Sequence, residues 1–250
     1  MINSYLALAK KTALSAGLII AENTNIKPAS IYFDENLPRE IKSTLDAKIE
    51  RHIISELKAT GLPILSEETP SNASIEHDQY SWIVDPIDGT MNYIRNFGES
   101  AISIALWKGL SPIFGVVYNN RDASMTWGGA EFGAQIDDTS IRVSELDLMS
   151  ESVVCTGFPS RWSWDASQQS KFFNRIMLFA KVRMIGSASL SLVNLSRGSV
   201  DAYFEDRIML WDVAAGLAIL EGAGGAFKIS DLGSDYSLNV SASNGKIKLA

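Results

Sequence analysis

The segment Asp85-Pro86-Ile87-Asp88-Gly89-Thr90 decides how this chain is interpreted. It follows residues 80–84, an apolar run of the kind that forms a buried strand. Pro86 restricts the backbone after the first aspartate and Gly89 relaxes it after the second, so both carboxylates can face one point. Two carboxylates held together repel each other unless a cation lies between them. Because oxygen ligands favour Mg²⁺, Ca²⁺ or Mn²⁺, the segment predicts a site for a hard divalent ion.

The composition excludes several classes of function. The chain has 250 residues, 46% of them hydrophobic, and a formal net charge of −7. It contains no basic tract, which argues against a nucleic-acid polymer as partner. The single cysteine, Cys155, excludes an intramolecular disulfide, and two histidines leave little for a zinc site. No apolar run reaches the ~18 residues of a membrane span, and residues 1–21 predict an amphipathic helix rather than a signal peptide. We therefore expect a cytoplasmic protein without membrane attachment.

The order of predicted elements divides the chain into two parts. Residues 1–146 combine two helices with a strand before Asp85, a hairpin and further short strands, which is typical of an α+β unit with a mainly antiparallel sheet. Residues 147–250 alternate strands and helices, which is typical of an α/β layer architecture. The helices are predicted at residues 1–21, 41–58, 167–179, 187–196 and 213–221.

Two more carboxylates accompany the central pair. Glu67 follows a short apolar run, and Asp212 opens the last predicted helix. Taken alone, Glu67 is readily interpreted as a solvated loop acid and Asp212 as a helix N-cap. A carboxylate at a helix start is also favoured by the helix dipole, so Asp212 can serve as cap and metal ligand together. Together with Asp85 and Asp88, the set indicates one acidic site.

These residues resemble the signature segments of the inositol monophosphatase family. The resemblance rests on Glu67-Glu68, on Asp85 to Thr90 and on Trp211-Asp212-Val213-Ala214-Ala215-Gly216, and it extends from about Asp46 to Gly225. The family belongs to the lithium-sensitive, magnesium-dependent phosphatases. The resemblance implies a layered αβαβα sandwich, a homodimer, and hydrolysis of the phosphate monoester of a small polyol or sugar, such as inositol monophosphate.

The resemblance also implies two or three Mg²⁺ ions per site. Glu67, Asp85 and the carbonyl of Ile87 would hold the first, and Asp85, Asp88 and Asp212 would hold the second. A third ion would bind near Glu67 through water. One ion would activate water for in-line attack on phosphorus, and another would stabilise the leaving oxygen.

The same resemblance assigns catalytic roles to Asp46, Glu67 and Thr90. The Thr90 hydroxyl, linked to Asp46, would orient the attacking water, although Asp46 can also be interpreted as an exposed helix acid. Backbone N–H groups of Gly89 and Thr90 would bind the phosphate at a helix start. The full set of implied substrate contacts is Ile87, Asp88, Gly89, Thr90, Gly186, Ser187, Ala188, Glu205 and Asp212.

Glu205 has two interpretations of equal weight. By resemblance it would accept hydrogen bonds from substrate hydroxyls, in a pocket also lined by Gly186-Ser187-Ala188. Because Asp206 and Arg207 follow it, Glu205 can equally belong to a surface ion pair.

Other functions stay open at this point. A bisphosphate nucleotidase or fructose-1,6-bisphosphatase would need a stacking or second-phosphate pocket, for which Trp127, Arg161, Trp162 and Trp164 are candidates. A catalytically silent metal-binding protein on the same fold is the third hypothesis.

The chain also departs from the family pattern. Lys42 places a cation near the expected site. Arg95 and Glu99 stand in a segment where they can alter substrate choice or dimer contacts.

Overall fold

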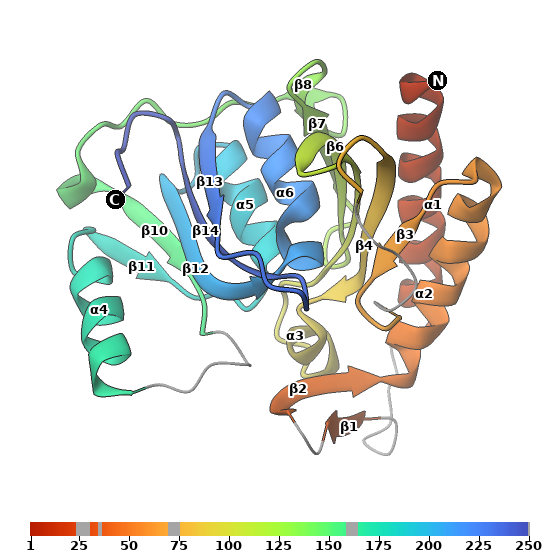
Figure 1. Cartoon of the computed structure of the whole chain (residues 1–250), viewed down its shortest axis with the longest axis horizontal. Coiled ribbons are helices and arrows are strands. Elements are labelled where there is room, and N and C mark those ends of the chain that lie inside the picture. Colours follow the sequence, from red (N-terminus) through yellow and green to blue (C-terminus); the bar gives the residue numbers. More distant parts are fainter. Residues whose placement is uncertain (24–30, 35–36, 70–75, 159–164, 250) are drawn as a thin grey trace.

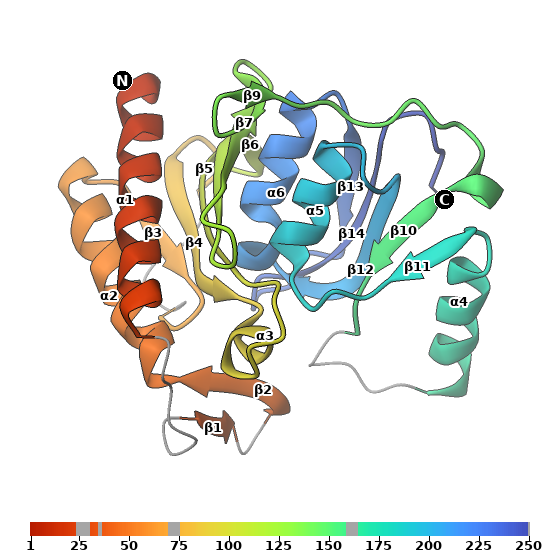
Figure 2. The same ribbon diagram turned by 180° about the vertical axis from the view of Figure 1, so that it is seen from behind.

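The computed structural model describes residues 1–23, 31–34, 37–69, 76–158 and 165–249, with 31–34 and 37–43 described by their backbone alone. The elements stack in five layers, in the order helix, sheet, helix, sheet, helix (Figure 1). The view from behind shows the same layers, with α5 and α6 between the two sheets (Figure 2). The expected αβαβα sandwich is therefore confirmed.

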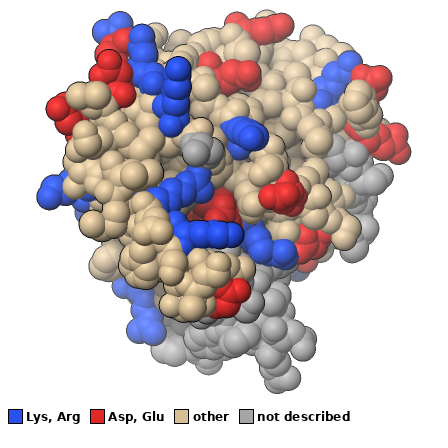
Figure 3. All heavy atoms as spheres, turned by 60° about the vertical axis from the view of Figure 1, so that its left-hand side comes forward, with Lys and Arg blue, Asp and Glu red and all other residues tan. Residues whose placement is uncertain are grey.

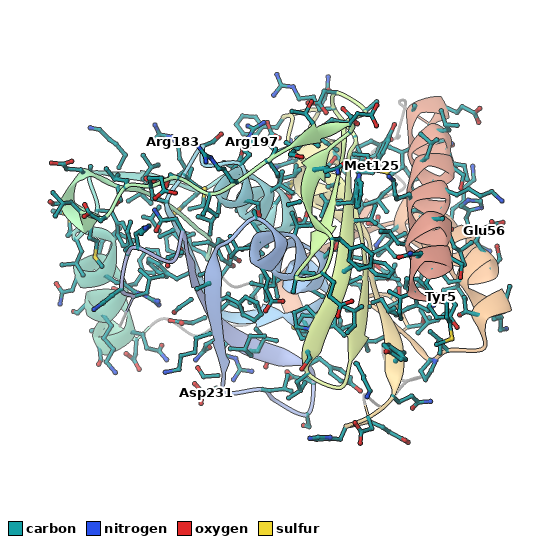
Figure 4. The ribbon with its side chains drawn as sticks, turned by 90° about the horizontal axis from the view of Figure 1, so that it is seen from above. Tyr5, Glu56, Met125, Arg183, Arg197 and Asp231 are labelled. Carbon is teal, nitrogen blue, oxygen red and sulfur yellow. The ribbon has the colours of Figure 1, made fainter. Side chains whose placement is uncertain are left out.

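The first outer layer consists of α1 (Ile2–Glu22) and α2 (Thr44–Leu57), which pack on each other and on one face of the first sheet. In the view from above, Tyr5 of α1 and Glu56 of α2 lie along this outer side of the molecule (Figure 4). Lys11 Nζ lies 3.7 Å from Glu56 Oε2, which joins the exposed edges of the two helices. A single apolar stripe drives the packing of α1, as its periodicity predicts. Its buried apolar residues are Leu6, Ala9, Ala13, Ala16 and Ile20.

The first sheet has seven strands in the order β3-β4-β5-β6-β7-β8-β9. β3 pairs with β4 in parallel, and every other neighbouring pair is antiparallel. Helices cover both faces of this sheet, and β4 and β5 are therefore buried along nearly their whole length. The strands are β3 (Ile64–Ser66), β4 (Tyr80–Asp88), β5 (Ala101–Lys108), β6 (Ser111–Asn119), β7 (Met125–Gly129), β8 (Gly133–Ile136) and β9 (Thr139–Ser140).

The second sheet has five strands in the order β11-β10-β12-β14-β13. β10 pairs in parallel with β11 and β12, whereas β14 is antiparallel to β12 and β13. Its outer face is covered by α4 (Ala166–Ile176), with Phe172 buried against the sheet. The strands are β10 (Val153–Thr156), β11 (Lys181–Arg183), β12 (Ala202–Met209), β13 (Ala226–Ser230) and β14 (Ser237–Ser243).

The middle layer is formed by α5 (Ala188–Ser196) and α6 (Leu210–Gly222). α6 is buried on nearly all sides because it contacts strands of both sheets. Its backbone is tied to the first sheet by Trp107, whose Nε1–H donates to the carbonyl of Ala214 at 3.2 Å. This contact fixes the start of α6, and thus Asp212, relative to β4 and β5.

The remaining elements are short. A hairpin of β1 (Ile31–Asp34) and β2 (Leu37–Ser43) precedes α2, and β2 contacts α3 (Thr90–Ile94) directly after the Asp85–Thr90 segment (Figure 1). Two 3₁₀ helices are η2 (Lys58–Thr60) and η4 (Met149–Glu151). In the part of the chain that is described, no helix has both the length and the apolar character needed to cross a bilayer.

Several local predictions were wrong. The helix expected from residue 41 begins at Thr44, because residues 37–43 pair with β1 as a strand. Residues 141–143 are not a strand; the edge strand is β9, directly before them. The passage from one sheet to the other falls between β9 and β10, in the region of the expected boundary at residues 146–147, and the division into two domains stays a prediction.

Candidate active site

The Asp85–Asp88 segment belongs to a bulged strand end, not to a turn. β4 continues through Asp88, and its pairing with β5 shifts between Asp85, opposite Ser103, and Asp88, opposite Ala101. In a regular strand, residues three apart point to opposite faces. The bulge, at Pro86 with its missing N–H, turns both carboxylates toward the same cavity. Gly89 follows at φ 85°, where a Cβ would lie 2.7 Å from the carbonyl oxygen of Glu99.

Glu67 and Asp212 reach the same place from other elements. Glu67 follows β3, the parallel neighbour of β4, and its backbone N–H donates to the carbonyl of Val84 at 3.3 Å. Asp212 lies in the first turn of α6, which begins at Leu210, so it is not the N-cap residue considered above. Its Oδ2 accepts a hydrogen bond from the backbone N–H of Met209 at 3.2 Å.

Asp88 is held by the start of α5. Its Oδ2 accepts hydrogen bonds from the hydroxyls of Ser187, at 2.6 Å, and Ser189, and from the Ser189 N–H at 2.7 Å. The backbone N–H of Ala188 lies 3.3 Å from Oδ1. Ser187 and Ala188, expected as pocket-lining residues, therefore also fix the direction of a buried carboxylate. Ser189 takes part without having been expected to.

The carboxyl groups destabilise one another's charged forms. Burial raises the pKa of Asp85 well above its ordinary value, and the charges of Glu67, Asp88 and Asp212 raise it further. Burial also raises the pKa of Asp212 well above the ordinary value, with Asp88 as the next cause. For Asp88 burial outweighs the four hydrogen bonds that lower its pKa. A cation placed among these groups would remove the repulsion, which is the behaviour expected of ligands for a hard metal ion.

The carboxyl groups touch each other in pairs. Asp85 shares one hydrogen bond with Glu67 and another with Asp212. Among the described residues, no three His, Cys, Asp or Glu side chains surround a single point as a preformed metal group. The donor chemistry thus fits hard cations, and binding them would displace the protons that the raised pKa values keep on these carboxyl groups.

Thr90 and Asp46 are brought together as the resemblance implied. Thr90 Oγ1 lies 2.9 Å from Asp46 Oδ1 and 2.9 Å from the carbonyl oxygen of Ile87. Its single proton can be donated to one of them at a time. Asp46 is 1% exposed, so it is not a solvated helix acid. The predicted hydrogen bond is confirmed; the catalytic roles stay predictions.

Glu205 is buried, which rules out its membership of a surface ion pair. It is 8% exposed and accepts a hydrogen bond from the Tyr203 hydroxyl at 3.0 Å, while Arg207 pairs with Asp235 at 3.8 Å. Burial, followed by the charge of Asp88, raises the pKa of Glu205 to about 7. Gly157 leaves room for it, because a Cβ there would lie 2.6 Å from Glu205 Oε2.

These groups surround one cavity of about 410 Å³. Of the expected site residues only Asp46 lies outside its walls, behind Thr90. None of the described residues that line it is Lys or Arg. The expected site residues in the walls are Glu67, Asp85, Ile87, Asp88, Gly89, Thr90, Gly186, Ser187, Ala188, Glu205 and Asp212.

Other candidates from the sequence lie elsewhere. Trp127 is on β7, where Lys10 Nζ lies 4.0 Å from its ring centre, away from the carboxylate cavity. Arg161, Trp162 and Trp164 lie outside the described residues, as does the side chain of Lys42. Arg95 and Glu99 do not line the cavity, and Glu99 pairs with Arg121 at 3.4 Å.

Sequence reasoning missed four residues that position the site. Ser189, Tyr203 and Gly157 hold Asp88 and Glu205 as described above. The Asn92 amide donates to the carbonyls of Glu99, at 2.8 Å, and Ile185, at 2.7 Å, and so ties α3 to the loop before α5. Only Tyr203 carried a signal in the sequence, since it stands two residues before Glu205 and shares its face of β12.

The raised pKa values predict an unusual pH dependence of stability. Without divalent ions, the folded protein keeps protons on these carboxyl groups at pH values above ~5, where the unfolded chain has released them. Each proton kept in this way lowers the free energy of unfolding by about 1.4 kcal/mol for every unit by which the pH rises. The free energy of unfolding should therefore fall as pH rises from 5.5 toward 8. Thermal unfolding in chelator at several pH values measures this.

The control is the Asp212→Asn variant, which cannot titrate at that position and should show a shallower pH slope. Mg²⁺ should raise the melting temperature more at pH 8 than at pH 6, because at pH 6 it competes with bound protons. A melting temperature in chelator that rises between pH 6 and 8 would contradict the raised pKa values.

Comparisons with known proteins give the chain its family. A family model described as the inositol monophosphatase family matches residues 1–243. The chain is 32% identical over 233 residues to a fructose-1,6-bisphosphatase/inositol-1-monophosphatase of Aquifex aeolicus, a match covering 91% of this chain and 86% of that protein. It is also 32% identical over 218 residues to the Nus factor SuhB of Xylella fastidiosa, covering 86% of this chain and 78% of the relative.

Comparison with solved structures leads to the same family. The solved structure of inositol monophosphatase from Anabaena (Nostoc) superposes with a TM-score of 0.81 at 28% sequence identity, covering 98% of this chain and 92% of the other. The match extends over both sheets and all the helix layers, so it includes every element that carries the carboxylate cavity. The chain therefore belongs to the inositol monophosphatase family, a family of metal-dependent phosphatases.

Proposed function

We propose that this phosphatase hydrolyses the phosphate monoester of a small polyol or sugar, such as inositol monophosphate, with Mg²⁺ as its cofactor. One observation carries the proposal: the carboxylate cavity has raised pKa values and no Lys or Arg among its described lining residues. Such a cavity repels a phosphate anion until cations occupy it. The names of the Aquifex and Anabaena proteins, both of which mention inositol monophosphatase, support the substrate class.

The proposed ligands are those implied by the signature segments. Glu67, Asp85 and the Ile87 carbonyl would hold one ion, and Asp85, Asp88 and Asp212 a second, with a third near Glu67. Bound Mg²⁺ supplies positive charge for the phosphate and lowers the pKa of water. The hydrogen bonds from Ser187 and Ser189 keep Asp88 pointing into the cavity.

Thr90 would orient the attacking water. If its proton is donated to Asp46, its oxygen is free to accept a hydrogen bond from water in the cavity. Asp46 is therefore proposed as the residue that fixes the Thr90 hydroxyl. The N–H groups of Gly89 and Thr90 would donate to phosphate oxygens.

Glu205 would bind the hydroxyls of the leaving alcohol. It lies on the second sheet, in the wall of the same cavity as the carboxylates, and the Tyr203 hydroxyl and Gly157 set its position. Gly186, Ser187 and Ala188 contribute to the same wall.

Replacing Ser189 by Ala is expected to weaken Mg²⁺ binding by about tenfold, because Asp88 loses a donor that orients it. Isothermal titration with Mg²⁺ measures the change. Ser196→Ala is the matched control, since Ser196 is buried on the same helix but donates to the carbonyl of Leu192. Equal Mg²⁺ affinities of the two variants would contradict the orienting role of Ser189.

Replacing Glu205 by Gln is expected to lower kcat/KM for polyol monophosphates by about tenfold or more at pH 8, because a charged acceptor of substrate hydroxyls is lost. Phenyl phosphate carries no such hydroxyls and should be hydrolysed at an unchanged rate. A proportional loss on both substrates would place Glu205 in the general structure of the site instead.

The experiment that tests the proposed function is phosphate release from a panel of esters, each with Mg²⁺ and with chelator. The panel contains inositol monophosphate, glycerol phosphate, fructose-1,6-bisphosphate, 3′-phosphoadenosine-5′-phosphate and histidinol phosphate. Mg²⁺-dependent turnover highest on inositol monophosphate supports the proposal. Preference for a bisphosphate would favour the alternative substrate classes. Mg²⁺ binding without turnover of any ester would favour the silent metal-binding protein.

The homodimer and the cytoplasmic location stay predictions, as does lithium sensitivity. Light scattering after size-exclusion chromatography measures the oligomeric state directly. A mass of one chain at micromolar concentration would contradict the dimer.

A further inference from the structure

A second cavity, of about 660 Å³, lies between α4 and the outer face of the second sheet. This is the size of ordinary small-molecule sites. It shares no described lining residue with the carboxylate cavity, and the sheet separates the two. Its lining residues include Lys171, Phe172, Arg175, Phe204, Asp206 and Lys248.

The floor of this α4 cavity is aromatic. The rings of Phe172 and Phe204 meet edge to face with centroids 6.1 Å apart, and Phe179 lies 6.4 Å from Phe204. All three side chains are buried, while Leu178 at the rim is 55% exposed. Phe158 also packs on Phe172, with ring centroids 5.1 Å apart, so the rings form a closed apolar base beneath the cavity.

The walls carry positive charge, although the whole protein has a net charge of −7. The Arg175 guanidinium lies 3.8 Å from the Phe204 ring centre, donates to Ser241 Oγ at 2.6 Å, and pairs with Asp206 at 3.7 Å. Lys171 and Lys248 are exposed and form no ion pair with another described residue. Lys and Arg side chains gather around the middle of this face, with acidic side chains among them (Figure 3).

The two cavities use alternate residues of one strand. Tyr203 and Glu205 of β12 face the interior and the carboxylate cavity, whereas Phe204 and Asp206 face α4. Asp206 already pairs with Arg175, so among the described lining residues the cations left for a ligand are Lys171 and Lys248.

We propose that the α4 cavity is a second binding site, for a small molecule that carries an anionic group on a flat apolar body. The apolar body would lie against the guanidinium plane of Arg175, which covers the Phe204 ring, and against the exposed Leu178. The anionic group would be bound by Lys171 and Lys248. The size of the cavity, its apolar base and its two lysines, which form no ion pair with another described residue, together select this ligand class over an uncharged apolar molecule or a bare anion. The proposal is independent of the substrate assigned to the carboxylate cavity.

The probe for the test is 1-anilinonaphthalene-8-sulfonate, an anion on a flat aromatic body, titrated into the full-length protein with Mg²⁺ present. Saturable binding at one site per chain is expected, detected by fluorescence. The double variant Lys171→Glu/Lys248→Glu should bind about tenfold more weakly, because two partly exposed attractive charges become repulsive. Asp206→Asn should bind more tightly, because it frees Arg175 and removes a negative charge.

The matched control is Lys48→Glu/Lys58→Glu, which makes the same charge change at exposed positions on α2 and η2 and should bind as the unmodified protein does. At equal ionic strength, benzoate should displace the probe at lower concentration than acetate does. The proposal is overturned by the absence of saturable binding, by equal affinities of the two double variants, or by equal displacement by benzoate and acetate.

Discussion

Replacing Asp85 by Asn is expected to lower kcat/KM for phosphate esters by about a thousandfold, equivalent to about 4 kcal/mol of transition-state stabilisation. Asp85 is 1% exposed and contacts both Glu67 and Asp212, so it alone is proposed to serve two ions. The amide keeps the shape of the side chain and can still accept the hydrogen bond from the Ile87 N–H, seen at 2.9 Å. The loss should therefore reflect charge, not misfolding.

The measurement is steady-state phosphate release at several Mg²⁺ concentrations, together with a Mg²⁺ titration by calorimetry. Asp78→Asn is the control, because Asp78 is an exposed acid that pairs with Lys108 at 3.5 Å, away from the cavity. In chelator, Asp85→Asn should melt at a higher temperature than the unmodified protein at pH 8, because it removes buried like-charge repulsion. Retention of more than a tenth of the activity would refute the assignment of Asp85 as the shared ligand.

Replacing Thr90 by Ala is expected to lower kcat by about a hundredfold while leaving KM and Mg²⁺ affinity nearly unchanged, since only the orientation of water is lost. The structure supplies the reason: the Thr90 hydroxyl lies 2.9 Å from the buried carboxylate of Asp46 and at the wall of the cavity. Thr90→Ser keeps the hydroxyl and should restore most of the turnover. Asp46→Asn should resemble Thr90→Ala.

The measurement is kcat at saturating Mg²⁺ and substrate, together with KM and the Mg²⁺ concentration that gives half-maximal activity. If Thr90→Ala instead raises KM or the Mg²⁺ requirement with kcat intact, Thr90 contributes binding and not water orientation.

The sequence predicted which carboxylates gather at the cavity, because they stand in short, distinctive segments. Asp85, Asp88 and Thr90 lie within six residues, and Asp212 is placed by the apolar helix that follows it. Even so, the physical reason given for the convergence of Asp85 and Asp88 was incomplete: a bulge in β4, which pairing with β5 makes visible, turns both side chains to one face.

Sequence patterns could not find contacts made across the fold. Ser189 contacts Asp88, which is 101 positions away in the sequence, and Asn92 contacts Ile185, which is 93 positions away. No local pattern marks Ser189 or Asn92 as a contact residue. The choice between the two interpretations of Glu205 likewise depended on burial, which a run of three charged residues does not reveal.

The sequence by itself determined the family, because its signature segments are short local motifs, and the resemblance to that family implied the layered fold. It also identified the carboxylates that the structure gathers at one cavity. Only the tertiary structure decided which hydroxyls hold Asp88, that Asp46 is buried behind Thr90, and that Glu205 and Asp206 face different cavities on either side of one sheet. The physical reason is that burial and hydrogen bonding belong to neighbours in space, and the packing of two sheets around α5 and α6 brings together residues that are far apart along the chain.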